Sequence, residues 1–493
     1  MPDKKWTKFP PKKPEVLTFK AQPKRDWSDY QKEIFRDISK GTGHTVVIAR
    51  AGSAKTSSLV EGSKYIPKGK KSLFCAFNKH IQEELKLRLG SYIECLTLHS
   101  LGFRGIKQRF GNVELDNDKC WNIVEEIVGN NFDLIDNICQ TVDFCKSNLV
   151  DTPSQIEELI CQYDIDLCET PSETFIKHVC QALRLCKEKT NVIDFNDMIW
   201  LPFVYRINVG KYDYVFIDEA QDLSKAQIEL ALSASKIDGR IIAVLDPRQA
   251  IYSWRGADTK VLENFKSRFS PKELALPICY RCPKSVVALA QTIVPDIMPY
   301  EKSPEGEIIE IDIENLQKYA KPGSYVLSRT NAPLIKHCMR FLKNSIPANI
   351  LGRDIGNGLL YLIKKSKKKK VSDLLKWVVE WEKQEKENLL IKYPKANTDF
   401  IADKAECINM LCEDAASLEE VKENIANLFK DNDEKSIVLF SSIHKIKGKE
   451  ADIVFVLADT LRVSNEEELN IKYVAFTRAK SKLYLARKAI KTF

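Results

Sequence analysis

Short apolar runs recur along the first half of the chain, and amphipathic segments separate them. The runs cover residues 45–48, 72–76, 92–96, 214–217 and 241–245. Apolar runs of this length are typical of strands buried on both faces of a parallel sheet, with helices in the connections. The pattern therefore predicts an α/β fold with a parallel sheet in this half.

A second set of short apolar runs, enriched in β-branched residues, follows in the other half. It covers residues 307–311, 325–328, 437–440, 453–457 and 483–486. The same reasoning predicts a second α/β unit with its own sheet.

Each set is interrupted by helical sequence in which apolar residues recur at spacings of three and four. These interruptions predict one helical insertion in each α/β unit. The expected organisation is a basic flexible arm (1–25), a first α/β domain (26–101 and 190–275) with a helical insertion (102–189), and a second α/β domain (276–355 and 434–493) with a lysine-rich helical insertion (356–433).

The composition is that of a soluble globular protein, with 44% hydrophobic and 29% charged residues among 493. A chain of this length forms more than one core. It lacks a run of about 18 apolar residues, so no membrane span is expected. The net charge is +8, and lysines are dense in residues 4–24 and 364–370. A polyanionic partner and a solvated surface run both explain the second cluster.

Fourteen cysteines raise the question of a metal or iron–sulfur site, since seven lie between Cys120 and Cys186. Their spacings within helical sequence do not form tight ligand pairs. Cys279 and Cys282 have the two-residue gap of a ligand pair, but no second pair lies near them. We expect free, mostly buried thiols in a reducing compartment, cytoplasmic or, in a eukaryote, nuclear.

A candidate phosphate-binding loop occupies residues 49–56, Ala-Arg-Ala-Gly-Ser-Ala-Lys-Thr, between an apolar strand and an expected helix. Backbone N–H groups and a helix N-terminus bind phosphate in this context. Lys55 is expected to neutralise the β- and γ-phosphates of ATP, and the Thr56 hydroxyl to bind Mg²⁺. The expected nucleotide contacts of the loop are Ala51, Gly52, Ser53, Ala54, Lys55, Thr56 and Ser57.

Two adjacent carboxylates follow the apolar run 214–217. Asp218 is expected to bind the metal together with Thr56, and Glu219 to orient or deprotonate a water molecule. The loop and these carboxylates together predict ATP hydrolysis.

Ala54 departs from the usual pattern of a phosphate loop, in which glycine directly precedes the lysine. The backbone at this position approaches phosphate closely and often needs the conformational freedom of glycine. Either a small shift accommodates the extra methyl group, or nucleotide binding is weakened.

The loop and the carboxylates belong to an ordered series of motifs that resembles superfamily 1 DNA helicases of the UvrD/Rep/PcrA type. The resemblance extends over about residues 27–485. It implies two RecA-like motor domains, with ATP in the cleft between them and single-stranded DNA across their other face. The further motifs lie at residues 29–31, 77–79, 97–100, 246–257, 279–283, 442–450 and 473–479.

The resemblance also implies nucleotide contacts outside the loop. Gln31 would read the adenine edge with its amide, Tyr280 would stack on adenine, and Glu450 would bind the ribose hydroxyl. The residues implied at the γ-phosphate are Gln249, Arg281 and Arg478, which complete a catalytic set with Lys55, Asp218 and Glu219.

DNA contacts are implied on both domains. Aromatic side chains there would stack on bases, and stacking contributes about 1–3 kcal/mol per base whatever the base is. The implied residues are Phe77, Asn78, Thr97 and His99 on the first domain, Tyr252, Trp254 and Arg255 next to the γ-phosphate contact, and His444 and Lys447 on the second domain.

The activity implied is that of an ATP-dependent DNA helicase that moves 3′-to-5′ on single-stranded DNA and opens duplexes at junctions. The protein is expected to be a monomer in solution. Replication, repair and recombination use such enzymes. The second insertion is short for this family, which suggests a minimal helicase that is less autoinhibited. Two alternatives stay open: a DNA clamp with weak ATP turnover because of Ala54, and a translocase that does not separate duplexes.

Overall fold

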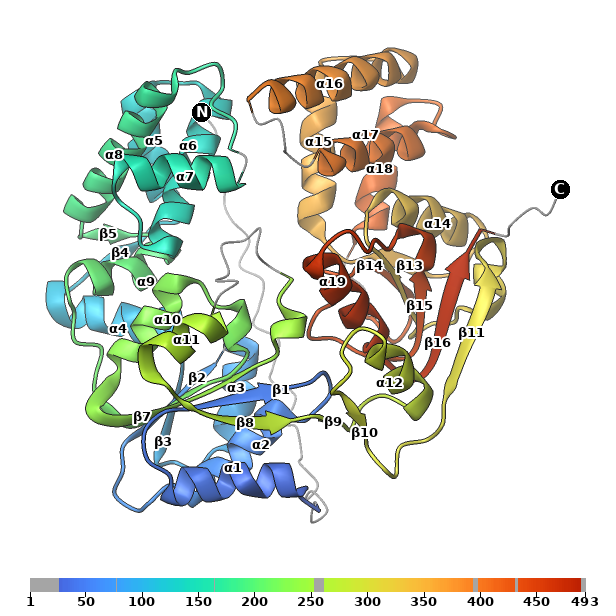
Figure 1. The fold of residues 1–493 in the computed structure, drawn as a ribbon. Helices are drawn as coiled ribbons and strands as arrows, with labels where there is room; N and C mark the ends of the chain where they lie inside the picture. Colours follow the sequence, from blue (N-terminus) through green and yellow to red (C-terminus); the bar gives the residue numbers. More distant parts are fainter. Residues whose placement is uncertain are drawn as a thin grey trace, which may run out of the picture.

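The computed structural model describes residues 26–76, 78–163, 165–251, 261–392, 398–430 and 433–488, and it contains two six-stranded sheets (Figure 1). Neighbouring strands are parallel in both sheets. The expected α/β class with two parallel sheets is confirmed.

The strand order differs between the sheets. The first sheet runs β3 (Ile93–Thr97), β2 (Ser72–Ala76), β6 (Tyr212–Ile217), β7 (Ser235–Leu245), β1 (Thr45–Ala49) and β8 (Lys272–Leu276). The second runs β11 (Glu307–Asp312), β16 (Ala479–Arg487), β15 (Ala451–Leu457), β12 (Tyr325–Ser328), β14 (Val438–Ser442) and β13 (Ala348–Ile350).

The central strands are buried on both faces, which explains why they read as continuous apolar runs. Val46 and Val47 are neighbours in β1 and both fully buried, yet they belong to hydrophobic cores on opposite faces of the sheet. Leu439 and Phe440 divide in the same way in the second sheet. Successive strand side chains point to opposite faces, and helices cover both.

Helices pack on the two faces of each sheet. One face of the first sheet is covered by α1 (Asp29–Lys40), α2 (Lys55–Gly62) and α3 (Lys79–Arg88), and the other by α4 (Leu98–Phe110), α10 (Lys225–Ser233) and α11 (Val261–Phe269). One face of the second sheet is covered by α12 (Lys284–Gln291) and α19 (Glu466–Phe476), and the other by α13 (Leu316–Tyr319) and α14 (Ala332–Lys343).

The first helical region forms a bundle with a core of its own. A two-stranded ribbon, which the apolar pattern did not predict, lies at its base. Helix α9 falls in the range expected for the first α/β domain, yet it contributes Met198, Trp200 and Leu201 to the bundle core. The elements are β4 (Glu114–Leu115), α5 (Lys119–Val128), α6 (Phe132–Asn148), α7 (Pro153–Tyr163), α8 (Ser172–Glu188), β5 (Val192–Ile193) and α9 (Phe195–Val204).

An ion network is buried inside this bundle. Asp197 Oδ2 accepts a hydrogen bond from Lys119 Nζ at 2.6 Å, and Asp197 Oδ1 forms an ion pair with Lys146 Nζ at 2.9 Å. Lys146 Nζ donates to Asp194 Oδ2 at 2.7 Å. Lys119 further donates to the Cys186 carbonyl at 2.8 Å. Buried charges are tolerated when they are paired, and each charge of this network is paired, although Asp197 Oδ1 lacks a hydrogen bond among the described residues.

Beside the network, burial raises the pKa of Asp143 to about 6. The folded state therefore binds this proton more tightly than the unfolded state does. The stabilisation that protonated Asp143 contributes is lost as pH rises from about 4 to about 6. Asp143→Asn keeps an acceptor for Asn196 Nδ2, which lies 2.6 Å from the carboxylate. We expect the melting temperature of the variant minus that of the wild type to increase from pH 4 to pH 7. A constant difference would contradict the raised pKa.

The second helical region shares one continuous core with the second sheet. Its elements are α15 (Arg353–Ser366), α16 (Val371–Lys392), α17 (Asp399–Cys412) and α18 (Leu418–Leu428). It rises beside the first bundle (Figure 1) and contacts it. The rings of Tyr361 and Phe132 stack at 5.8 Å, and the Tyr361 hydroxyl donates to Asp133 at 3.1 Å. Of the described helices, none is long and apolar enough to cross a membrane.

Candidate active site

The carboxyl ends of β1, β6 and β7 lie at the same edge of the first sheet because the strands are parallel. The phosphate-binding loop follows β1 and leads into α2, while Asp218 and Glu219 follow β6. Open α/β sheets bind ligands outside the carboxyl ends of their strands. The topology therefore brings together two motifs that lie about 160 residues apart.

Lys55 sits among carboxylates at this edge. Its Nζ lies 3.3 Å from Glu219 Oε1, and its side chain is 8% exposed. Burial alone would lower the pKa of Lys55, but the charges of Glu219, Asp246 and Asp218 outweigh burial and raise it. The lysine is therefore held as a cation, as a phosphate ligand requires.

Thr56 and Asp218 are in direct contact, with Thr56 Oγ1 donating to Asp218 Oδ2 at 2.5 Å. Burial, and next the charge of Glu219, raise the pKa of Asp218. A hydroxyl and a carboxylate are the oxygen ligands that Mg²⁺ takes from a protein, with phosphates and waters completing its shell. A divalent cation would also relieve the repulsion between the two carboxylates, so the donor set fits Mg²⁺.

The loop itself has two residues in the left-handed region. Gly52 has φ 68° and Ala54 has φ 60° and ψ 39°. A Cβ atom added at Gly52 would lie 2.7 Å from Arg281 Cβ and 2.8 Å from Cys279 Sγ, so only glycine fits there. Ala54 directly precedes α2 and adopts a conformation that costs an L-residue about 1–2 kcal/mol. The glycine usual at this position would adopt it freely.

We expect Ala54→Gly to stabilise the folded loop by up to about 1 kcal/mol and to lower KM for ATP, because relief of the left-handed strain exceeds the entropy cost of glycine. Thermal unfolding and steady-state kinetics would measure both effects. Ala51→Gly is the matched control. Ala51 is fully buried and lacks a positive φ, so glycine there should destabilise the protein. Two variants shifting in the same direction would refute the assignment of strain to Ala54.

The other loop residues contribute in different ways. The backbone N–H of Ala51 donates to the Tyr473 hydroxyl at 2.9 Å. The Ser57 hydroxyl accepts a hydrogen bond from Arg88 at 3.0 Å. The Ser53 hydroxyl is buried and has no hydrogen-bond partner among the described residues. Of these three residues, Ser53 is thus the one whose polar group is available to bond to the expected nucleotide.

Gln31 and Tyr280, both expected at adenine, lie together. The Tyr280 hydroxyl donates to Gln31 Oε1 at 3.3 Å, and Gln31 Nε2 donates to the Ser58 hydroxyl at 2.9 Å. Gln31 also accepts from the backbone N–H of Ser28 at 3.0 Å, which closes a capping box at the start of α1. The amide is thereby fixed within reach of the loop.

Arg281 and Arg478 approach the cleft from the second α/β half but bond within that half. Arg281 forms an ion pair with Glu450 and donates to the Thr477 carbonyl at 3.2 Å. Arg478 is 1% exposed and donates to the Val474 carbonyl at 3.0 Å. Burial, reinforced by the charge of Arg281, lowers the pKa of Arg478 to about 10. Glu450, expected at the ribose, is the ion-pair partner of Arg281.

Gln249 follows β7 and donates to Asp246 Oδ2 at 2.7 Å. Asp246 is fully buried and lies 3.2 Å from Arg50 NH1. The Gln249 amide is therefore placed next to the carboxylates that surround Lys55.

Lys447, expected at DNA phosphates, bonds to residues of the first half of the molecule. Its Nζ is 2.5 Å from Asp222 Oδ1 and donates to the backbone carbonyl of Gln249, and its side chain is 7% exposed. Burial raises the pKa of Asp222 to about 6, although Lys447 opposes the shift. The lysine thus joins the second half of the molecule to the ATP edge of the first. The DNA contact expected of Lys447 stays a prediction.

The two halves of the molecule are also joined by contacts that the motifs did not reveal. Arg50 Nε lies 2.9 Å from Asp296 Oδ1. The backbone N–H of Tyr280 donates to the Gly52 carbonyl at 2.9 Å, and Tyr473 holds Ala51. Tyr473 and Asp222 fall inside recognised motifs, so their polar groups could have been suspected from the sequence. Arg50 likewise lies in the phosphate-binding loop, whereas Asp296 gives no such signal.

The expected DNA residues of the first half act partly as helix caps. Asn78 Oδ1 accepts the Ile81 N–H at 2.9 Å at the start of α3, and Thr97 Oγ1 accepts the Ser100 N–H at 3.1 Å at the start of α4. The His99 ring packs edge-on against Phe195 at 5.9 Å, and burial lowers the pKa of His99. Both caps lie at the same sheet edge as the phosphate loop.

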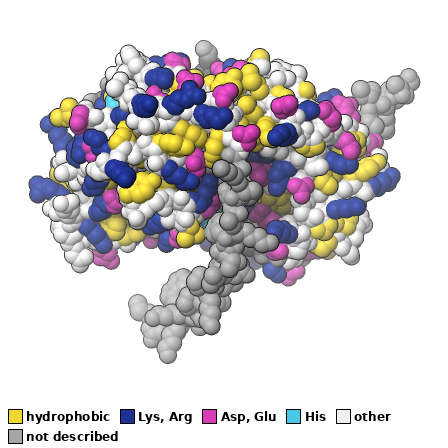
Figure 2. Space-filling view, turned by 90° about the horizontal axis from the view of Figure 1, so that it is seen from below, with side chains coloured by type: hydrophobic (Ala, Val, Ile, Leu, Met, Phe, Trp, Pro, Cys, Tyr) yellow, Lys and Arg dark blue, Asp and Glu magenta, His cyan; other side chains and the backbone are white. Residues whose placement is uncertain are grey.

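The other residues expected to contact DNA include His444 and four residues of the first half. His444 is half-buried in the turn after β14, four residues before Gly448. On the face seen in Figure 2, Lys and Arg side chains are interspersed with acidic and hydrophobic ones, so charge does not mark a single path there. Phe77, Tyr252, Trp254 and Arg255 lie outside the described residues.

All fourteen cysteines are free and most are buried, as the spacings predicted. Cys282 donates its backbone N–H to Cys279 Sγ at 3.4 Å, so this pair packs beneath Gly52. Within the described part of the chain, no group of three or more His, Cys, Asp or Glu side chains could hold a metal ion.

Comparison with protein families gives two matches. The model of the UvrD/REP helicase N-terminal domain matches residues 30–270, and that of the UvrD-like helicase C-terminal domain matches residues 438–486. Together they cover more than half of the chain. The chain belongs to the UvrD/Rep helicase family.

Curated relatives agree with this family. An F-box DNA helicase protein 1 of Schizosaccharomyces pombe is 25% identical, with 89% of this chain and 55% of the relative covered. An ATP-dependent DNA helicase Rep of Buchnera aphidicola is 25% identical over 53% of this chain and 43% of its own length. An ATP-dependent DNA helicase PcrA of Staphylococcus aureus is 24% identical over 63% and 49%. The chain spans about half the length of these relatives.

Proposed function

We propose that the chain is an ATP-dependent DNA helicase, driven by ATP hydrolysis between two motor domains. The observation that carries the proposal is the cluster of Lys55, Thr56, Asp218 and Glu219 at one edge of the first sheet. Burial and the charge of Arg281 lower the pKa of Arg478 in the second half, and the charge of Glu219 is among those that oppose this shift. The cluster supplies positioning and charge stabilisation, which are the main contributions of a protein to phosphoryl transfer.

Each member of the cluster has a proposed task. Lys55 neutralises the β- and γ-phosphates, while Thr56 and Asp218 hold Mg²⁺, whose charge offsets that of the phosphates. Glu219 is the proposed base or orienter of the attacking water. Burial alone would raise the pKa of Glu219, but the positive charges of Lys55 and Lys447 outweigh burial and lower it. Glu219 therefore stays ionised.

The two arginines couple hydrolysis to domain movement in this proposal. Arg281 and Arg478 now bond to Glu450, Thr477 and Val474 of their own half. Reaching a γ-phosphate requires them to exchange these partners for phosphate oxygens. Hydrolysis would then depend on closure of the second domain onto the first, and alternate closure would move the protein along DNA.

The motor domains are proposed as residues 26–101 with 190–275, and residues 276–355 with 434–493. Single-stranded DNA and its junctions with duplex are the proposed partners, with 3′-to-5′ movement by a monomer. The buried free thiols suit a reducing compartment, cytoplasmic or nuclear. Replication, repair and recombination are the proposed settings.

A clamp that binds DNA with weak ATP turnover is a second candidate, favoured by one observation. Ala54 adopts the left-handed conformation at the point where the loop approaches phosphate. If strain there limits turnover, Ala54→Gly should raise kcat sharply. An unchanged kcat would remove the support for the clamp.

The deciding experiment combines ATP turnover with strand separation. We expect single-stranded DNA to stimulate ATP hydrolysis, and a duplex with a 3′ overhang to be opened faster than one with a 5′ overhang. Stimulation without opening of either duplex would identify a translocase. DNA binding without stimulation would identify the clamp. Preference for the 5′ overhang would refute the proposed polarity.

A further inference from the structure

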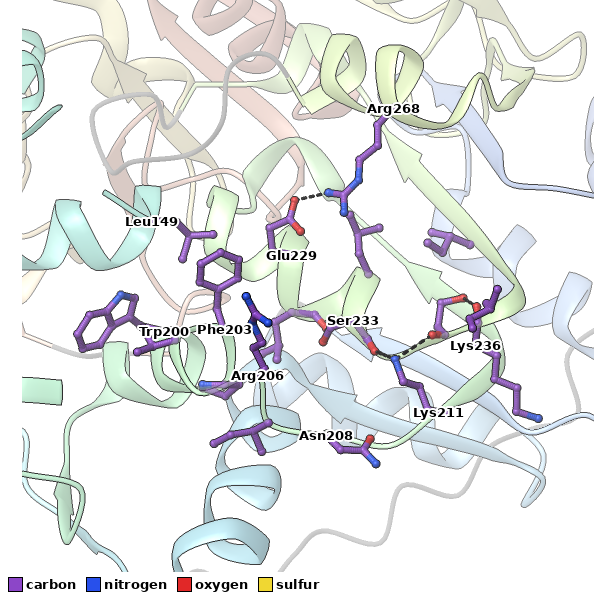
Figure 3. A pocket seen from close by; sticks show the side chains of 18 of the residues that line it. Leu149, Trp200, Phe203, Arg206, Asn208, Lys211, Glu229, Ser233, Lys236 and Arg268 are labelled. Carbon is purple, nitrogen blue, oxygen red and sulfur yellow. Dashed lines mark hydrogen bonds and ion pairs between the residues drawn. The ribbon is translucent and has the colours of Figure 1, made fainter. Parts of the chain in front are cut away.

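A cavity of about 840 Å³ lies in the first α/β half, at the sheet edge opposite the ATP site (Figure 3). Its lining includes His44 just before β1, Lys211 just before β6, and Ser235 at the start of β7. These strands are parallel, so their amino ends meet here while the phosphate loop lies at their carboxyl ends. We call it the amino-edge cavity. An occupant would not compete with ATP.

The floor of the amino-edge cavity is apolar, and two large apolar side chains are exposed at it. Trp200 and Leu230 line it and are buried. Phe203 is 50% exposed and Ile237 is 108% exposed. Ile237 lies where the register of β6 and β7 shifts between Tyr212 and Tyr214, so extra residues of β7 project outward. Exposed apolar groups around a cavity are typical of a binding surface.

Positive charge on the lining exceeds negative charge. Arg268 is neutralised by Glu229, and Lys236 by Asp213 at 3.0 Å (dashed lines in Figure 3 mark the first pair). The remaining basic side chains of the lining are Lys187, Arg206 and Lys211, and among the described residues none of them forms an ion pair. Lys211 Nζ donates to the Ser233 and Ser235 carbonyls at 2.6 Å and 3.3 Å. Asp151 is the other acid there. The lining therefore keeps a net positive charge.

Arg206 sits where the backbone favours glycine. It has φ 47°, and it follows α9 in a turn where its N–H donates to the Phe203 carbonyl at 3.2 Å and the Ile207 N–H to the Pro202 carbonyl at 2.8 Å. This is the Schellman arrangement of a helix end, whose left-handed position is usually glycine. An exposed arginine there costs conformational energy and is not needed for the turn. Backbone strain at a residue that the turn does not require suggests a functional role for that residue.

We propose that the amino-edge cavity docks an acidic segment of a partner protein that inserts one large apolar side chain. Acidic side chains complement Lys187, Arg206 and Lys211, and an apolar anchor fits the floor around Trp200 and Leu230. The first 25 residues of this chain contain eight Lys or Arg and two acids, so their charge does not suit the cavity. Nucleic acid suits it less, because Asp151 lines it and its apolar lining, apart from Trp200, Phe203 and Phe269, is aliphatic.

The test uses the full chain as target for a library of random twelve-residue peptides. We expect the enriched peptides to share an excess of Asp and Glu and one aromatic or large aliphatic residue. A labelled enriched peptide should lose about 10-fold or more in affinity for the double variant Lys187→Gln, Arg206→Gly, and also for Phe203→Ser. Arg206→Gly removes charge while suiting the left-handed turn, so its melting temperature should not fall.

Lys318→Gln is the matched control, because Lys318 is exposed on α13 of the second half. It should leave peptide affinity unchanged, and KM for ATP should be unchanged in all variants. Enriched peptides without acidic excess, or equal affinity for the double variant, would overturn the proposal. If the double variant instead loses affinity for an oligothymidine, the cavity is a nucleic-acid surface and the proposal is wrong.

Discussion

Replacement of Lys55 by alanine is expected to lower the rate of ATP turnover by about 100- to 1000-fold, the usual loss when one electrostatic group is removed from a water-excluded site. The side chain is 8% exposed and is surrounded by the charges of Glu219, Asp246 and Asp218. Alanine would leave these carboxylates to face ATP phosphates without a compensating cation. Steady-state ATP hydrolysis with saturating single-stranded DNA measures the effect.

Lys64→Ala is the matched control, since Lys64 lies just beyond α2 and forms a solvent-exposed pair with Glu61 at 2.7 Å. Surface pairs of this kind contribute about 0–1 kcal/mol to stability, so turnover should be unaffected. Circular dichroism would establish that both variants fold. If Lys55→Ala folds and retains a tenth or more of the wild-type rate, Lys55 is not the phosphate ligand and the proposed site is wrong.

The sequence was sufficient for the parts of the structure that follow from local pattern. Strands β1 and β6 were recognisable because both faces are buried, which leaves an uninterrupted apolar run. Parallel topology then placed Lys55, Asp218 and Glu219 at one edge, since each follows a strand of the same sheet. The fold class and the ATP cluster are therefore consequences of strand pattern and strand direction.

Contacts between the two halves could not be predicted in this way. Lys447 meets Asp222 across 225 residues of sequence, and Arg50 meets Asp296 across 246. Such pairings depend on how the domains pack, which no local periodicity encodes. A lysine in a DNA-contacting motif is also chemically equivalent to one that pairs with a carboxylate. Only the fold distinguishes the two environments.

The buried ion network of the first bundle was equally hidden. Its lysines and aspartates occupy helical sequence in which charged residues would ordinarily face solvent. Asp194 caps α9 and Asp197 lies in its first turn, a pattern that reads as simple capping. The network nevertheless brings together α5, α6 and α9 and makes the bundle dependent on charge pairing.

Asp197→Ala is expected to destabilise this bundle by about 3–5 kcal/mol, because it leaves two buried ammonium groups without their shared partner. Both Lys119 and Lys146 are nearly inaccessible, with side chains 2% and 1% exposed. The bundle has its own core, so the loss should be local. Hydrogen exchange of α5, α6 and α8 should be faster by about 100- to 5000-fold, since each 1.4 kcal/mol corresponds to a factor of ten.

Glu126→Ala provides the comparison, because Glu126 pairs with Lys189 at 3.1 Å in the same bundle but is 63% exposed. Its removal should change the free energy of opening, as measured by hydrogen exchange, by less than about 1 kcal/mol, as for other surface pairs. Each variant removes one carboxylate from an ion pair, so a difference between the two effects reports the burial of Asp197 and not the loss of charge alone. Equal effects of the two substitutions would show that water reaches the network and that Asp197 is not a structural centre of the bundle.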